Sequence, residues 1–285
     1  MTEFKSWQSF WHFEEAVIRR TRYVHSSEIG EFLEAVRQTA AKHADVLPAG
    51  TPLWRAQLGN DWKSDQSNEN DFPTLDIPDS ADVVWVSSFS PDHPRLPGIP
   101  CPFGPTRMKP LRECAIEGRA NPRGIPFLYL ATDHKTAIGE VRPWIGSHVS
   151  VGLFKTGPEL KLVNCTVGPL NVIHMGREPP AEKREELVWT RIGDAFARPV
   201  TPNDGVADYA PTQIIAELLR ADGFDGVRYR SSLGEGHNIV LFDVDAAELE
   251  KCDLFTIRNV TFDADEGGNP GKQGGVWHIT WGKRP

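Results

Sequence analysis

Closely spaced cysteines are missing from this sequence. Its four cysteines are scattered along 285 residues, at Cys101, Cys114, Cys165 and Cys252. Structural zinc sites and disulfide-stabilised folds both need cysteines at close or paired spacings. We therefore expect neither a disulfide scaffold nor a metal site.

A signal peptide and a membrane-spanning run are missing as well. The N-terminal segment places Glu3, Lys5 and His12 among its aromatic residues, whereas a secretory signal contains an uninterrupted apolar stretch. No apolar run approaches the ~20 residues that cross a bilayer. The sequence thus predicts a cytoplasmic protein that does not interact with a membrane.

Basic residues are in the minority. The chain has 31 Lys and Arg against 39 Asp and Glu, and its net charge is −8 at pH 7. This balance argues against general affinity for nucleic acid. Residues 107–123 depart from this acidic balance, because this segment contains five basic side chains and only two acidic ones. Such a patch suits a small anionic ligand, for example a pyrophosphate, and the alternative is an evenly solvated loop.

The motifs of two common enzyme classes are absent. No glycine-rich dinucleotide fingerprint precedes a helix, so hydride transfer finds no support. No Gly-x-Ser-x-Gly elbow is present and no His–Asp partner is evident, which argues against a serine nucleophile.

The chain is otherwise ordinary, with 39% hydrophobic and 25% charged residues, and it is long enough for one principal domain with extensions. Residues 1–47 have the pattern of two amphipathic helices, and Ser26 or Ser27 can cap the second. Their aromatic residues indicate either a partner surface or a helix pair docked on the main domain. The proline-rich segment 91–110 is expected to form neither helix nor central strand, and to serve as a wall or lid of a site or as a plain surface connection.

Local patterns predict the remaining elements. The segments 147–154 and 160–165 alternate in a way that is typical of antiparallel strands. The segment 276–281 is a candidate edge strand that follows a flexible glycine-rich stretch at 266–275. We also expect strands at 51–58, 81–89, 125–131, 226–230 and 238–243, and helices at 133–141, 181–196 and 212–221.

One stretch, from Gly118 to Pro143, combines several chemically useful side chains. Arg119 lies in a loop whose shape is set by glycines and Pro122, and the glycines would let the backbone approach a ligand closely. Tyr129 lies on a strand that is apolar on both faces, which indicates an interior strand. Glu140 lies on the following helix, and no cation stands at helical spacing from it.

Each of these three residues also has an ordinary structural interpretation. Arg119 can simply anchor a loop. Tyr129 can be a core aromatic residue with a hydrogen-bonded hydroxyl, and Glu140 can be a solvated helical glutamate. The convergence of a loop guanidinium, a strand phenol and a helix carboxylate on one hollow is therefore the hypothesis that coordinates must test.

The order GR-x-N-P-x-G-I-P-x-x-Y-L-A, followed by T-A-x-x-E-V-R-P, resembles the core of the RES domain family. That family consists of bacterial toxin components of toxin–antitoxin pairs, usually neutralised by a helix-turn-helix antitoxin. The resemblance implies an α+β fold similar to ADP-ribosyltransferases, with mainly antiparallel strands, flanking helices and an N-terminal helical extension. It also implies consumption of NAD⁺. It covers about 51–243, which leaves 1–47 and 244–285 as extensions.

The resemblance extends to two further positions. Arg55, in the first strand of the main domain, matches an arginine that the family places close to the nucleotide. A functional serine of the family follows the strand 226–230, where Ser231 and Ser232 both fit; we favour Ser232. The alternative is that both serines only make turn hydrogen bonds.

These residues together suggest a reaction at the nicotinamide–ribose bond of NAD⁺. Arg55 and Arg119 can bind the pyrophosphate, Tyr129 can face the nicotinamide, and Glu140 can stabilise positive charge on the ribose. We expect no cofactor besides NAD⁺ as the substrate.

The acceptor can be water, inorganic phosphate or a protein side chain, which gives a glycohydrolase, a phosphorylase or an ADP-ribosyltransferase. A non-catalytic ADP-ribose-binding or nucleotide-binding module and an interaction protein acting through 1–47 are alternatives. The expected partners are NAD⁺ and a helix-turn-helix antitoxin, and the oligomeric state is left open.

Overall fold

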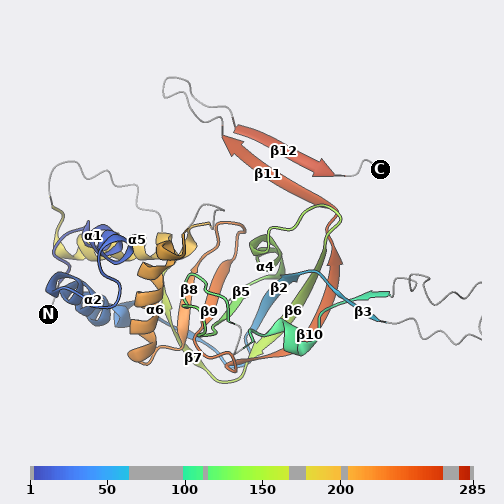
Figure 1. Ribbon diagram of the computed structural model, residues 1–285, viewed down its shortest axis with the longest axis horizontal. Coiled ribbons are helices and arrows are strands. Elements are labelled where there is room, and N and C mark those ends of the chain that lie inside the picture. Colours follow the sequence, from blue (N-terminus) through green and yellow to red (C-terminus); the bar gives the residue numbers. More distant parts are fainter. Residues whose placement is uncertain are drawn as a thin grey trace, which may run out of the picture.

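The computed structural model describes residues 3–63, 99–111, 115–166, 178–199, 205–265 and 276–282. Within them an eight-stranded sheet is flanked by helices, which gives an α+β fold (Figure 1). The expected strand at 81–89 and the glycine-rich stretch 266–275 lie outside the described residues. No helix in the described part of the chain is long and apolar enough to cross a membrane.

The main sheet is mixed, and most of its neighbouring strands are antiparallel. Its strands in spatial order are β1 (Ala44–Leu47), β7 (Leu160–Asn164), β8 (Gly226–Arg230), β9 (His237–Leu241), β5 (Leu128–Ala131), β2 (Pro52–Leu58), β6 (His148–Thr156) and β10 (Ala247–Thr256). Only β7 and β8 pair in parallel. The prediction that 160–165 is an antiparallel strand therefore holds for its pairing with β1 and is wrong for its pairing with β8. The helices between β7 and β8 form the long crossover that a parallel pair needs.

Both terminal segments contribute a strand to this sheet. The helical prediction for 1–47 is wrong at Ala44–Leu47, which pairs with β7 as the edge strand β1. Past residue 243, β10 pairs with β6 along its length. The segment 276–281 is a strand as predicted, but it pairs with β11 (Asn259–Asp265) as β12 (Val276–Gly282) and not with the main sheet. Figure 1 shows this hairpin standing away from the end of β10.

The helices begin and end where the sequence signals place them. Ser26 caps α2 (Ser27–Ala40) by accepting from the Ile29 N–H at 3.4 Å, and Asp133 caps α4 (His134–Glu140). The other helices are α1 (Ser9–Arg19), α3 (Pro105–Met108), α5 (Ala181–Ala197) and α6 (Ala210–Ala221), with short 3₁₀ turns at Ala41–His43 and Val206–Tyr209.

The proline-rich segment contains more regular structure than its composition predicts. Its described part forms β4 (Ile99–Cys101), which pairs with β3 (Asp61–Lys63), and the four-residue helix α3. The prediction that no helix forms here is wrong, because Pro105 occupies the first turn, where the missing N–H breaks no intrahelical bond. Phe103 and Met108 are buried in the core beside Leu53.

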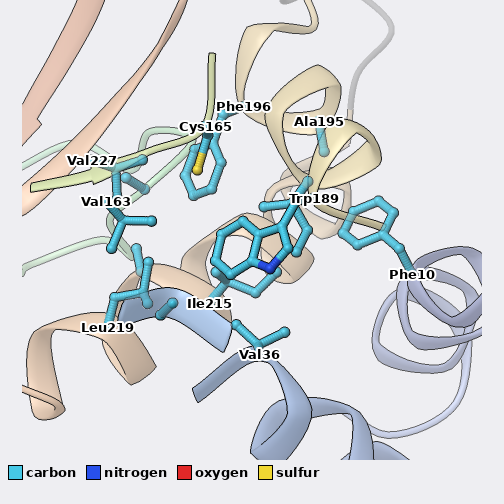
Figure 2. Close-up of a cluster of buried hydrophobic side chains, with 14 of the residues drawn as sticks. Phe10, Val36, Val163, Cys165, Trp189, Ala195, Phe196, Ile215, Leu219 and Val227 are labelled. Carbon is cyan, nitrogen blue, oxygen red and sulfur yellow. The ribbon is translucent and has the colours of Figure 1, made fainter. Parts of the chain in front are cut away.

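Trp189 of α5 lies at the centre of the larger hydrophobic core (Figure 2). Its ring is fully buried, and its Nε1 donates to the Thr39 hydroxyl at 2.9 Å. The helices α1 and α2 supply Phe10, Phe13 and Phe32 to the same cluster. The interpretation of residues 1–47 as a helix pair docked on the main domain is thus confirmed for α1 and α2.

Strand β5 is an interior strand, as its two apolar faces predict. It lies between β9 and β2. Leu128 and Leu130 face one core, whereas Phe127 and Tyr129 belong to the core around Trp189. The antiparallel register places Ala131, at the end of β5, opposite Asn238, at the start of β9, so the helix that follows β5 begins beside that end of β9.

Candidate active site

Two adjoining pockets lie where α4 meets the centre of the sheet. One has a volume of about 260 Å³ and the other about 430 Å³. Tyr129, Glu140, Tyr229 and Asn238 line both. Ligand pockets in proteins commonly enclose ~300–1,000 Å³, so a ligand of dinucleotide size would occupy both.

Arg55 forms part of the smaller pocket at a split in the sheet. Strands β2 and β5 share a single backbone pair, Trp54 with Ala131. The Arg55 Nη1 donates to the Tyr129 carbonyl at 3.2 Å, and its Nε is buried without a hydrogen-bond partner among the described residues. Burial lowers the pKa of Arg55 to about 10. The guanidinium remains charged at neutral pH, and a bound anion would offset part of the free energy that burial costs this charge.

Arg119 lines the larger pocket, and its loop is held by the Tyr129 hydroxyl. That hydroxyl donates to the Asn121 Oδ1 at 2.7 Å and accepts from the Ala120 N–H at 3.0 Å. Asn121 is 2% exposed, and its amide donates to three backbone carbonyls of the surrounding loop. The phenol of Tyr129 therefore fixes the shape of the loop in addition to presenting its ring to both pockets.

The same loop is also tied to helix α6. The Thr212 hydroxyl donates to the Arg119 carbonyl at 2.5 Å, and Gln213 donates to the carbonyls of Gly118 and Asn121. A Cβ at Gly118 would lie 2.5 Å from the Tyr129 hydroxyl oxygen. The close approach that the glycine permits is thus to this phenol, whereas the sequence suggested an approach to a ligand.

The Arg119 guanidinium bonds to the chain as well as facing the pocket. Its Nη1 donates to the Ala195 carbonyl at 3.3 Å, and its Cζ lies 5.5 Å from the centre of the Tyr209 ring. Arg142 and Arg198 line the same pocket, and Arg198 also forms an ion pair with Glu14 at 3.2 Å. Apart from that pair, Arg119 and Arg142 line the pocket together with a single carboxylate, that of Glu140. This excess of positive charge suits an anionic ligand.

Glu140 is the last residue of α4, and its carboxylate is exposed to both pockets. The Ser231 hydroxyl and the Asn238 amide both donate to its Oε1, each at 2.6 Å. Among the described residues no Lys, Arg or His forms an ion pair with it. The sequence therefore correctly indicated a carboxylate without a cationic partner.

The two serines occupy different environments. Ser231 bonds to Glu140 and accepts from the Leu233 N–H at 3.0 Å. Ser232 lines the larger pocket. Ser231 thus lies next to the Glu140 carboxylate, whereas Ser232, which we favoured from the sequence, lies on the wall of the larger pocket.

The profile of the RES domain matches residues 100–265. This span covers more than half of the chain. The protein belongs to the RES domain family. The span includes Arg119, Tyr129, Glu140 and both serines, whereas Arg55 precedes it.

Two other comparisons were made with known proteins. Among solved structures, the chain is similar to one described as the crystal structure of the M. tuberculosis MbcT-MbcA toxin-antitoxin complex, with 11% identity and a TM-score of 0.37. That similarity covers 78% of this chain and 92% of the other. No curated protein matches the sequence.

Several residues that line or support the candidate site carry no distinct signal in the sequence pattern. Asn238 and Tyr229 line both pockets, and Asn121 organises the Arg119 loop. Asn238 is the exception, since a lone amide in the apolar run NIVLF needs a partner when buried. Arg142, just past the end of α4, takes a left-handed backbone conformation with φ 46°. Nothing in the local sequence marked it as a residue that lines the pocket.

The proline-rich segment, the cysteines and the two phenols complete the description of the region around the site. Residues 99–111 of the proline-rich segment line neither pocket, so this part forms no wall or lid of the site. No cluster of His, Cys, Asp and Glu able to hold a metal occurs in the described ranges. Cys101, Cys165 and Cys252 are free thiols. Burial raises the pKa of both Tyr129 and Tyr229, so both phenols stay protonated at neutral pH.

Proposed function

We propose that this RES domain cleaves the bond between nicotinamide and ribose in NAD⁺, and passes the ADP-ribosyl group to phosphate or water. The observation that carries the proposal is the position of Glu140. Its carboxylate borders both pockets, it has no cationic partner among the described residues, and each pocket is also lined by at least one arginine.

The carboxylate matches the charge that develops in this reaction. As the C–N bond breaks, its electron pair moves to the nicotinamide nitrogen, which becomes neutral, and positive charge develops on the ribose ring. A fixed carboxylate near that ring stabilises the transition state more than the substrate. The leaving group is already cationic in NAD⁺, so no strong general acid is needed.

The arginines match the other end of the substrate. A guanidinium can bind two phosphate oxygens at once. Arg119, Arg142 and Arg198 line the larger pocket, which suits the pyrophosphate. The smaller pocket combines the aromatic Trp54 and Tyr129, which suit the nicotinamide ring, with the buried Arg55, which suits a phosphate oxygen.

The acceptor determines the products. Phosphate attacking the ribose gives nicotinamide and a phosphorylated ADP-ribose, whereas water gives nicotinamide and ADP-ribose and releases a proton. The guanidinium groups of Arg119 and Arg142 in the larger pocket support phosphate as an acceptor, because a phosphate there would meet positive charge, whereas Arg198 is already paired with Glu14.

Family membership supports a biological role for this reaction. As a member of the RES domain family, the protein is proposed to be a toxin that depletes cellular NAD⁺ and is neutralised by a helix-turn-helix antitoxin. We expect its expression to arrest growth, and Glu140→Gln to abolish that arrest without loss of soluble protein. Normal growth with abundant wild-type protein and unchanged NAD⁺ would contradict the role.

The decisive experiment is mass spectrometry of the products formed from NAD⁺ with and without inorganic phosphate. We expect free nicotinamide in both cases and a phosphorylated ADP-ribose only with phosphate. Glu140→Gln should lower the rate by about 10²-fold or more, whereas Glu235→Gln, an exposed change outside both pockets, should leave it unchanged. Binding of ADP-ribose without any nicotinamide release would identify a binding module, and an ADP-ribosyl adduct on an added protein would identify a transferase.

A further inference from the structure

Two hydrogen-bond donors converge on one oxygen of the candidate catalytic carboxylate. The Asn238 amide and the Ser231 hydroxyl each lie 2.6 Å from Glu140 Oε1. No hydrogen bond from the described residues reaches Oε2. The protein thus engages one carboxylate oxygen and leaves the other available to a ligand.

Asn238 is the more rigid of the two donors. It is 7% exposed and lies on the central strand β9, paired with Ala131 on one side and Tyr229 on the other. Ser231, by contrast, lies in the loop between β8 and β9 and takes its position from the Leu233 N–H. A side chain on an interior strand has little freedom to move away from its partner, so Asn238 sets the position of Oε1.

The location of Glu140 makes such a donor necessary. A helix C-terminus carries partial negative charge, which disfavours a carboxylate at the last residue. An amide N–H and a hydroxyl that donate to Oε1 offset this repulsion, because each places partial positive charge against the carboxylate oxygen. The amide nitrogen of Asn238 can only donate, so it holds Oε1 as an acceptor.

We propose that Asn238 is a positioning residue that holds the Glu140 carboxylate through Oε1, with Oε2 facing the ribose. The inference rests on the proposed function and names the oxygen that acts. It assigns Glu140 the role of electrostatic stabiliser of the ribose cation, and it excludes donation of a proton from Oε1.

The test compares Asn238→Ala and Asn238→Asp with the wild type in the nicotinamide-release assay. Loss of a hydrogen bond to a charged group should lower kcat by about 10- to 100-fold. KM should change little, because the arginines that bind the pyrophosphate are untouched. Asn259→Asp is the matched control, since this exposed asparagine on β11 lines neither catalytic pocket.

The pH profile of Asn238→Asp separates positioning from a structural role. At high pH two carboxylates would repel each other, and at low pH they would share one proton and restore a hydrogen bond between the same side chains. We expect roughly tenfold recovery of kcat relative to wild type between pH 8 and pH 5. A profile parallel to that of the wild type, or an unchanged kcat in Asn238→Ala, would overturn the inference.

A structural readout keeps the inference testable if the wild type releases no nicotinamide, which would refute the proposed function. Crystal structures of the wild type and Asn238→Ala should show Glu140 against residue 238 in the first and displaced in the second. A Glu140 side chain that keeps its position in Asn238→Ala would refute the positioning role whatever the activity.

Discussion

Replacing Tyr129 with phenylalanine removes one hydroxyl and keeps the aromatic ring. The sequence suggested that the ring faces the nicotinamide, whereas the structure gives the hydroxyl a second task in holding the Arg119 loop. The substitution therefore separates the two roles. If only the ring of Tyr129 matters, the variant should be stable and active. If the hydroxyl holds the Arg119 loop, the variant should be less stable and should bind the nucleotide poorly.

The expected cost follows from the two hydrogen bonds that are lost. Without the hydroxyl, the Asn121 Oδ1 and the Ala120 N–H lose their partner, and both residues are nearly inaccessible to water. A buried polar group left unsatisfied costs ~1–3 kcal/mol. The free energy of unfolding should thus fall by about 2–4 kcal/mol, which lowers the melting temperature by roughly 5–15 °C for a chain of this size.

The assay is thermal unfolding of the purified variant, followed by titration with ADP-ribose. Tyr229→Phe is the matched control for the unfolding measurement alone, because Tyr229 is also buried and its hydroxyl makes no hydrogen bond with the described residues, and ligand binding is compared with the wild type because Tyr229 lines both pockets. Tyr129→Phe should melt well below that control and bind ADP-ribose more weakly. Equal melting temperatures for the two variants would show that the hydroxyl of Tyr129 does not hold the loop.

Three further predictions address the same site. Gly118→Ala would place a Cβ 2.5 Å from that phenol oxygen and should cost ~1–3 kcal/mol in urea unfolding, whereas Gly104→Ala, with nothing within 4 Å, should not; equal stabilities would contradict the close packing. Arg55→Met removes a buried cation that lacks a carboxylate partner, so we expect an unchanged or higher melting temperature but weaker ADP-ribose binding by calorimetry. Retained affinity would remove Arg55 from the nucleotide site. Ser231→Ala should lower kcat by about tenfold through the lost bond to the carboxylate, and Ser232→Ala should mainly raise KM; the opposite pattern would exchange their roles.

Local signals predicted the elements that carry the site. The apolar faces of 125–131 indicated an interior strand, and β5 is one. The sequence offered Thr132 or Asp133 as the cap of the helix expected at 133–141, and in the structure Asp133 is the cap, since its carboxylate accepts from the Thr136 N–H at 2.9 Å. These signals depend on residues a few positions apart, which is why the sequence alone revealed them.

Pairings between distant segments could not be predicted in this way. Ala44–Leu47 is too short to show a hydrophobic periodicity. It becomes a strand because it pairs with the free edge of β7, more than a hundred residues later in the chain. Asn238 and Glu140 likewise come from segments 98 positions apart. The sequence contains both the Asn238 amide and the Glu140 carboxylate but does not show that they meet. They meet because β9 pairs with β5, and α4, which carries Glu140, follows β5 directly.

The split between β2 and β5 explains why Arg55 suits an anion better than a structural role. An arginine that served the fold would have a carboxylate partner, since an unpaired buried cation is costly. Here the described contact is a single neutral carbonyl, that of Tyr129, and the Nε has no partner among the described residues. Because no described group of the fold compensates this charge, an anionic ligand is the natural partner, and Arg55, on β2, presents its charge to the smaller pocket while it bonds to the neighbouring strand β5, which carries the phenol.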